Sequence, residues 1–220
     1  MERRESLSLS EWAVLACLAE RPRHGYDIAT VLAPAGELGA VWRVTRPLVY
    51  RALDRLDALG LIEARHTEAG DGGPPRVVYG ARPQGRDRLA RWLREPVPHL
   101  RDVRGALLLK LVVAGRLGID TGPLVAAQRA RFADALAALA TPPPPGDAVA
   151  AWRHRSGAAV AAFLDDLDGG QSVSNSSVLT MSAQMTSTLT PRTASAHQGA
   201  TKMASTDSEA EMKAHSNPSI

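Results

Sequence analysis

Residues 44–63, VTRPLVYRALDRLDALGLIE, decide the fold of this chain. At helical spacing, their apolar side chains form one stripe of Leu48, Val49, Ala52, Leu53, Leu56 and Leu59. A basic and aromatic face outside the stripe contains Arg46, Tyr50, Arg51, Asp54 and Arg55. Thr45 is a candidate N-cap, Pro47 suits the first turn, and Gly60 supplies a stop. The pattern predicts an amphipathic helix over these residues.

Two short strands are predicted after this helix, at residues 61–66 and 76–80, with a turn-rich stretch at 67–75 between them. Helix, strand, loop and strand follow each other in this order in a winged helix-turn-helix, whose helix enters the major groove of DNA while the loop forms the wing. A second interpretation stays open, because exposed helices often carry charge. Arg51 and Arg55 could be solvated, or paired with Asp54 and Asp57.

The composition limits the possible functions. The chain has 220 residues and a formal net charge of only +3, so a nucleic-acid surface must come from local clustering of its basic residues. Those residues are mostly arginine, which can bridge guanine or phosphate with two hydrogen bonds. The lone cysteine, Cys17, excludes an internal disulfide and fits a reducing cytoplasm as a buried thiol. Neither a signal peptide nor a membrane-spanning apolar stretch is present, so we expect a cytoplasmic protein.

Two further helices are predicted before residue 44. Ser8 or Ser10 can cap the first helix, which extends to about Glu20 with an apolar face that includes Trp12 and Leu15. The second helix begins around residues 24–27 and is broken by Pro34. Three helices and a two-stranded wing therefore occupy residues 8–81.

Three motifs in this region resemble the PadR family of transcription factors. They are LSEWAVL at residues 9–15, HGYDI at 24–28, and VYRALDRL at 49–56 running into Gly60-Leu61-Ile62. Residues 76–79, Gly85 and 89–93 are similar to the family's second wing strand and the helix after it. Arg82 departs from the family pattern, which usually has threonine there, so the start of that helix is less certain. The resemblance covers about residues 8–95.

The resemblance implies a dimeric bacterial repressor whose recognition helix reads the major groove. Tyr50 matches the family's recognition-helix tyrosine and becomes a candidate phosphate contact. Arg46, Arg51 and Arg55 are added from the exposed helical face, with surface ion pairing as their alternative role. Arg65, His66 and Arg76 flank a Gly-Gly-Pro-Pro tip at residues 72–75 that could lie along a groove. We expect His24 to be a cap and Tyr26 a core residue, not ligands.

A helix is predicted at residues 85–95 with Leu89, Trp92 and Leu93 inward, and Pro96 and Pro98 end the first domain. Residues 98–170 then form a helical dimerisation domain, which resembles the C-terminal region of larger PadR proteins. Its three helices are expected at about 102–117, 121–140 and 147–167, the last with Val149, Trp152 and Phe163 in phase. Pairing with a second copy would cover their apolar faces, with a monomeric helical cap as the alternative.

Residues 171–220 have a different composition, rich in Ser, Thr, Ala and Met, and are expected to be a disordered tail without a function. The predicted fold class is thus mainly α with a small β-wing. It comprises a winged helix at 8–95, the helical dimerisation domain at 98–170 and this tail.

Motifs of enzyme chemistry are absent from the sequence. The six histidines and one cysteine show no metal-ligand spacing, and neither a Gly-rich phosphate loop nor a Gly-x-Ser-x-Gly elbow occurs. We therefore expect no enzyme, no cofactor and no metal.

The leading hypothesis is a homodimeric repressor that binds a double-stranded DNA operator. Trp92, Trp152 and Phe163 could line a site for a small hydrophobic or aromatic effector that releases it, although aromatic residues at helical spacing are more often core. The alternative hypothesis is a winged helix that binds protein and has no operator. Asp54 and Asp57 motivate it, because carboxylates repel phosphate.

Overall fold

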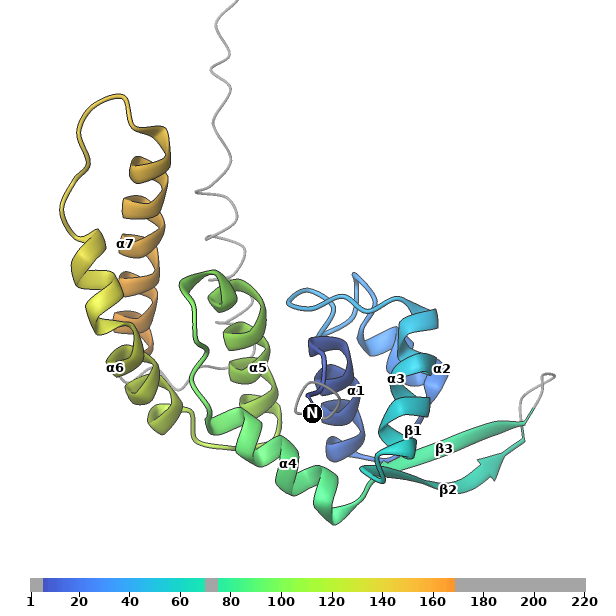
Figure 1. Ribbon diagram of the computed structural model, residues 1–220. Helices are drawn as coiled ribbons and strands as arrows, with labels where there is room; N and C mark the ends of the chain where they lie inside the picture. The colour runs from blue at the N-terminus through green and yellow to red at the C-terminus, as the bar shows by residue number, and fades with distance from the viewer. Residues whose placement is uncertain (1–5, 70–74, 169–220) are drawn as a thin grey trace, which may run out of the picture. The chain divides into compact units, whose positions relative to one another are not determined.

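The computed structural model describes residues 6–69 and 75–168, which form a mainly helical fold with one small antiparallel sheet (Figure 1). The N-terminal elements are α1 (Leu9–Glu20), β1 (Arg23–His24), α2 (Gly25–Val31), α3 (Arg46–Ala58), β2 (Ile62–Glu68), β3 (Arg76–Ala81) and α4 (Pro83–Arg94). A short 3-10 turn (Leu100–Asp102) and a π-helical turn (Val103–Leu107) lead into α5 (Leu108–Arg116), α6 (Gly122–Leu139) and α7 (Ala148–Asp168). The winged-helix prediction is confirmed by this order of elements.

Helix α1 is the central helix of the hydrophobic core. Ser8 caps it in a capping box: its hydroxyl accepts from the Glu11 N–H at 3.3 Å, while its own N–H donates to the Glu11 carboxylate at 2.6 Å. Every residue from Trp12 to Ala19 is buried, including Cys17. Burial raises the pKa of the Cys17 thiol to about 12, which keeps it protonated and fits the predicted structural role.

The helix predicted within residues 44–63 is confirmed as α3. Pro47 lies in the first turn of α3. Gly60 follows the C-cap residue Leu59 and has a φ of +66°, a conformation that favours glycine. Thr45 occupies the N-cap position, although its side chain makes no capping hydrogen bond. Leu48 was wrongly assigned to the buried stripe, because it is 41% exposed. At 100° per residue it lies roughly 90° from the centre of the stripe, outside the contact with α1.

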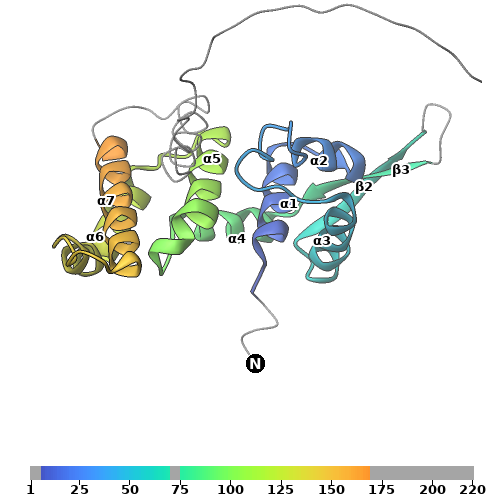
Figure 2. The same ribbon diagram turned by 90° about the horizontal axis from the view of Figure 1, so that it is seen from above.

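The sheet has one strand more than the sequence predicted. Its order is β1-β3-β2, and the two-residue strand β1 pairs with β3 through Arg23 opposite Tyr79 and His24 opposite Val78. Figures 1 and 2 show β2 and β3 leaving the helices as a hairpin. Residues 70–74 between these strands, which include most of the predicted wing tip, lie outside the described residues.

Helix α4 begins at Pro83, two residues before the predicted start, and it buries Leu89, Trp92 and Leu93 as expected. Arg82 is its N-cap without a side-chain hydrogen bond, in agreement with the missing threonine.

The helix predicted at 102–117 is interrupted by the 3-10 and π-helical turns before α5 begins. α6 and α7 lie side by side in both ribbon views. Residues 171–220, predicted to be a tail, lie outside the described residues.

Helix α5 is joined to the N-terminal elements by apolar and charged contacts. All seven residues from Leu108 to Ala114 are buried, and the leucine and valine side chains among them share one core cluster with side chains of α1 and α4. At its end, Arg116 donates to the carboxylates of Glu20, at the end of α1, and Glu37, in the loop before α3. In the described part of the chain, no helix is long and apolar enough to span a membrane.

Candidate nucleic-acid interface

A groove of about 540 Å³ separates α2 and α3 from strand β3. It is lined by His24, Gly25, Tyr26, Arg46, Tyr50, Leu53, Asp54, Pro75, Arg76, Val77 and Tyr79. Four of its lining side chains are aromatic or imidazole rings and two are arginines, so the groove combines cations with flat apolar surfaces. Such a combination suits the sugar-phosphate backbone and bases of a nucleic acid.

The exposed face of α3 carries three of the predicted contact residues. Tyr50 is 44% exposed and Arg46 and Arg51 are also exposed. Arg51 lines a second groove, of about 710 Å³, together with Leu48 and the start of α1. Among the residues that the structure describes, neither Asp54 nor Asp57 forms an ion pair with Arg51. The predicted helical face is therefore accessible at these three positions.

Arg55, the fourth predicted residue of this helix, is directed toward α1. Its Nε lies 2.9 Å from the Glu11 carboxylate, and its Nη2 donates to the Ser6 carbonyl at 3.3 Å. The sequence suggests Asp54 or Asp57 as partners of Arg55, whereas Glu11 lies in another helix, 44 residues away in sequence. Arg55 thus links α3 to the capped start of α1, and it can contact DNA only if it shares or breaks that ion pair.

The predicted wing residues are exposed, and two of them pair with acidic neighbours on their own strand. Arg65 lies 2.9 Å from the Glu63 carboxylate, and His66 lies 3.1 Å from that of Glu68. Arg76 instead places its guanidinium 5.6 Å from the centre of the Tyr26 ring. Of these three wing residues, only Arg76 lines the groove beside α3.

In the HGYDI motif, His24 has the predicted role and Tyr26 does not. His24 caps α2 as predicted, since its Nδ1 accepts from the Asp27 N–H at 3.0 Å. The prediction that Tyr26 belongs to the core is wrong, because its side chain is 50% exposed. Gly25 and Ile28 are the buried residues of this short helix, and the ring of Tyr26 lies on the side opposite Ile28, in the groove.

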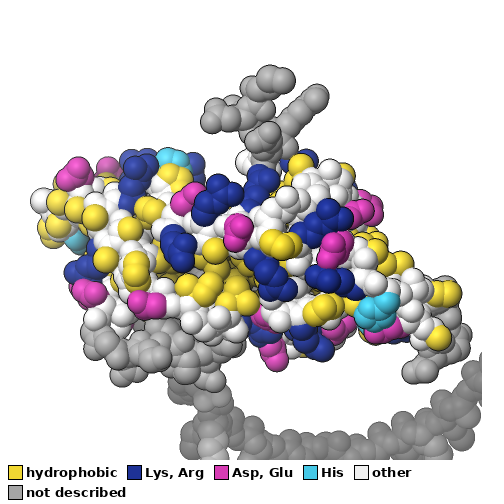
Figure 3. All heavy atoms as spheres, turned by 90° about the horizontal axis from the view of Figure 1, so that it is seen from below, with side chains coloured by type: hydrophobic (Ala, Val, Ile, Leu, Met, Phe, Trp, Pro, Cys, Tyr) yellow, Lys and Arg dark blue, Asp and Glu magenta, His cyan; other side chains and the backbone are white. Residues whose placement is uncertain are grey.

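Charge on this part of the molecule is mixed. Figure 3 looks from the side on which α4 and the β2–β3 hairpin lie in Figure 1, and shows arginine side chains spread over the surface with acidic side chains between them. This agrees with the small net charge. Any attraction for DNA must therefore come from a few well-placed arginines and not from a uniformly basic face.

The three predicted effector residues lie in different surroundings. Trp92 is buried and stacked on Trp12, with ring centres 4.7 Å apart. Phe163 is buried in α7, whereas Trp152 on the same helix is 52% exposed. Val149, expected in phase with them, is 60% exposed. Only the Val149 and Trp152 part of α7 therefore offers an accessible apolar surface.

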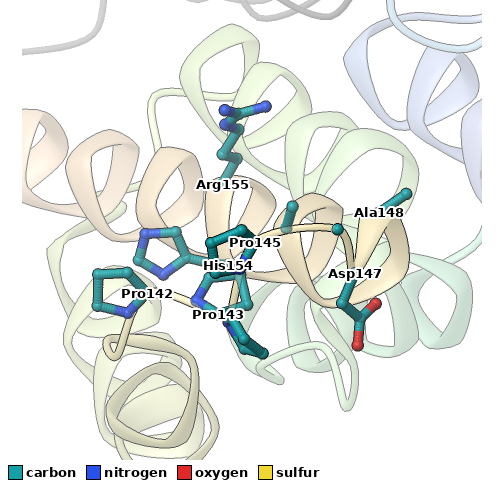
Figure 4. A pocket seen from close by; sticks show the side chains of 10 residues that line it. Pro142, Pro143, Pro145, Asp147, Ala148, His154 and Arg155 are labelled. Atoms are coloured by element: carbon teal, nitrogen blue, oxygen red, sulfur yellow. The ribbon is translucent and has the colours of Figure 1, made fainter.

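A separate shallow pocket of about 480 Å³ lies at the proline-rich loop between α6 and α7 (Figure 4). His154 lies beside Pro142 and Pro143 while Arg155 points away from them. The imidazole Nδ1 of His154 is 2.7 Å from the Leu139 carbonyl, so this ring links α7 to the last residue of α6. Among the residues described, no group of three or more His, Cys, Asp or Glu side chains could hold a metal ion.

Comparison with known proteins links this arrangement to a family. Residues 14–91 match the model of the transcriptional regulator PadR-like family. A probable transcriptional regulator of Mycobacterium tuberculosis, Rv1176c, is 32% identical over 96 residues, which are 44% of this chain. The matched part spans about half, 49%, of that relative's length.

Two solved structures are similar at low identity. The crystal structure of Bacillus subtilis PadR in complex with operator DNA has 20% identity and a TM-score of 0.40, covering 73% of this chain and 97% of that one. The crystal structure of smu.1604c from Streptococcus mutans has 16% identity and a TM-score of 0.36, covering 71% and 96%. The family match, the three sequence motifs and the winged-helix fold agree in making residues 14–91 of this chain similar to the transcriptional regulator PadR-like family.

Proposed function

We propose that this protein is a homodimeric transcriptional repressor that binds a two-fold symmetric DNA operator through α3 and the β2–β3 hairpin. The observation that carries the proposal is the accessible face of α3, where Arg46, Tyr50 and Arg51 are exposed beside a groove that also contains Arg76 of β3. The description of the matched family, transcriptional regulators, supports the same assignment. The similar structure from Bacillus subtilis is that of PadR in complex with operator DNA.

Two copies are part of the proposal. A winged helix reads a symmetric operator when two recognition helices are held about one helical turn apart. Val149 and Trp152 are large apolar residues that lie more than half exposed on α7. Covering such residues with the same helix of a second copy would bury them and set the distance between the two α3 helices. Release by a small molecule would require an effector that favours another dimer geometry.

The direct test is fluorescence anisotropy with the full-length protein and a duplex that it has selected from a random pool. Tight binding to the selected duplex, weak binding to a scrambled one and a steep loss of affinity with salt are expected. A winged helix used only for protein binding is the second candidate, since Asp54 lines both grooves beside α3. That candidate predicts equal weak binding to both duplexes.

Arg51 is the residue with which base recognition can be tested. We expect Arg51→Ala to weaken operator binding by about 1 to 3 kcal/mol and to relax the preference at one base pair, because arginine reads guanine through two hydrogen bonds. The measurement is the Kd for the selected duplex and for its single-base variants. Arg131→Ala, which removes the same charge from an exposed position on α6, is the control. Equal affinities for the Arg51 variant and this control would remove Arg51 from the interface.

A further inference from the structure

Tyr26 occupies a position in the groove that its predicted core role does not explain. Its ring is half exposed, and two guanidinium groups lie over it: the Cζ of Arg46 is 4.9 Å from the ring centre, and that of Arg76 is 5.6 Å away. Arg46 is the first residue of α3 and Arg76 the first of β3, 30 positions apart in sequence. The Tyr26 ring is thus in contact with one guanidinium from α3 and one from the β2–β3 hairpin.

The ring is held by the surroundings of α2. His24 caps the helix through the Asp27 N–H, and the Asp27 carboxylate pairs with Arg23 at 3.3 Å. Tyr50 closes the groove from the side of α3: a Cβ on Gly25 would lie 2.7 Å from its ring, so a larger residue at position 25 would require the Tyr50 ring to shift. The backbone that carries Tyr26 is therefore fixed from two sides.

Stacking on an aromatic face leaves the hydrogen-bonding edge of a guanidinium free. An arginine paired with a carboxylate uses its N–H donors in that pair, whereas the ring quadrupole attracts the cation through its flat face. Among the described residues, neither Arg46 nor Arg76 forms an ion pair with a carboxylate. Two like charges drawn to one ring repel each other unless an anion joins them, and Asp54 is the one carboxylate among the residues that line this groove.

We propose that Tyr26 is a positioning residue that holds Arg46 and Arg76 over one DNA backbone phosphate, so that the recognition helix and the hairpin close on the same anion. This inference rests on the proposed function and names the contact that fixes the hairpin relative to α3. The non-bridging oxygens of a phosphate can accept from both guanidinium groups at once. The contact carries no sequence information and sets the register of α3 in the groove.

The test uses the full-length protein, its selected duplex and a series of duplexes that each carry one neutral methylphosphonate. Wild type should lose affinity on the order of tenfold at one position per half-site, the position that Arg46 and Arg76 share. Arg46→Ala and Arg76→Ala should each lose part of the sensitivity to the methylphosphonate at that same position, because the remaining arginine still contacts the phosphate. Two different positions for the two variants would overturn the shared contact.

Variants of Tyr26 test the part played by the ring. Tyr26→Phe keeps the aromatic face and should bind like wild type, while Tyr26→Leu should lose affinity and lower the slope of log Kd against log salt by about 1. In the Tyr26→Leu background, Arg46→Ala and Arg76→Ala should no longer show coupled effects. An equal loss for the Phe and Leu variants, or unchanged coupling, would overturn the assignment of the ring. Wild-type protein that binds all duplexes weakly and equally would instead refute the proposed function itself.

Discussion

Replacing Gly85 with alanine is expected to destabilise this protein by about 3 kcal/mol. Gly85 lies in the first turn of α4, and a Cβ there would come within 2.2 Å of the Leu61 carbonyl oxygen. The obstacle is backbone, and the same carbonyl accepts from the Arg82 N–H at 3.0 Å, so it cannot move without breaking the junction of β3 and α4. Denaturant unfolding followed by circular dichroism measures the change.

The matched control for this substitution is Gly115→Ala. Gly115 is an exposed glycine inside α5, where alanine is the better helix former, so the free energy of unfolding should rise by up to about 1 kcal/mol. Operator affinity of Gly85→Ala, measured where the variant is still folded, should also fall, because α4 fixes the end of the hairpin. A Gly85→Ala variant as stable as wild type would show that α4 does not need this close approach.

Lys110 is expected to make the free energy of unfolding depend on pH in the alkaline range. This lysine is only 3% exposed, and its ammonium donates to the carbonyls of Trp92 and Glu95, 4.6 Å from the centre of the Trp92 ring. Burial lowers its pKa to about 8 from an ordinary value of 10.5, with the Glu95 carboxylate acting in the opposite direction. Between these two pH values the unfolded chain binds the proton more tightly, so the folded state gains stability as pH rises.

The expected gain is about 3 kcal/mol between pH 8 and 10.5, and below pH 8 the full penalty for burying the charge is present. Cys17 acts in the opposite sense above pH 9, because its raised pKa makes the unfolded chain lose the proton first. The quantity to measure is therefore the difference in unfolding free energy between wild type and Lys110→Met at pH 7.5, 9 and 10.5. A difference that stays flat across this range would mean that the Lys110 ammonium keeps an ordinary pKa inside the fold.

Local signals allowed much of the fold to be predicted from sequence. Ser8 with Glu11, Pro47 and Gly60 act within a few residues of the helix ends that they define, so α1 and α3 were placed nearly as found. Strand β1 could not be predicted in this way, because two residues have no periodicity and exist as a strand only through pairing with β3. The π-helical turn before α5, VRGAL, carries no sequence signal that distinguishes it from the start of an α-helix either.

In the candidate interface, too, the features set by local sequence could be predicted and those set by distant contacts could not. The exposure of Tyr50 and Arg51 follows from the helical periodicity of α3 alone, and both residues are exposed as predicted. The ion pair of Arg55 with Glu11 and the position of Tyr26 under Arg46 and Arg76 depend on segments 20 to 50 residues apart. Which side chains meet across such sequence distances depends on how the helices and strands pack. The spacing of residues along the sequence does not reveal that packing.

The contacts of α5 determine where this protein can be recombined with its relatives. A junction at Pro96 would separate α1 and α4 from Lys110 and Arg116, leaving the Glu20 carboxylate and two carbonyls at the end of α4 without these partners. Gly118 is the better crossover point: it follows α5, has a φ of +65°, and a side chain there would meet nothing within 4 Å. A hybrid protein that takes its α6 and α7 from a relative should therefore keep residues up to 118 from this chain.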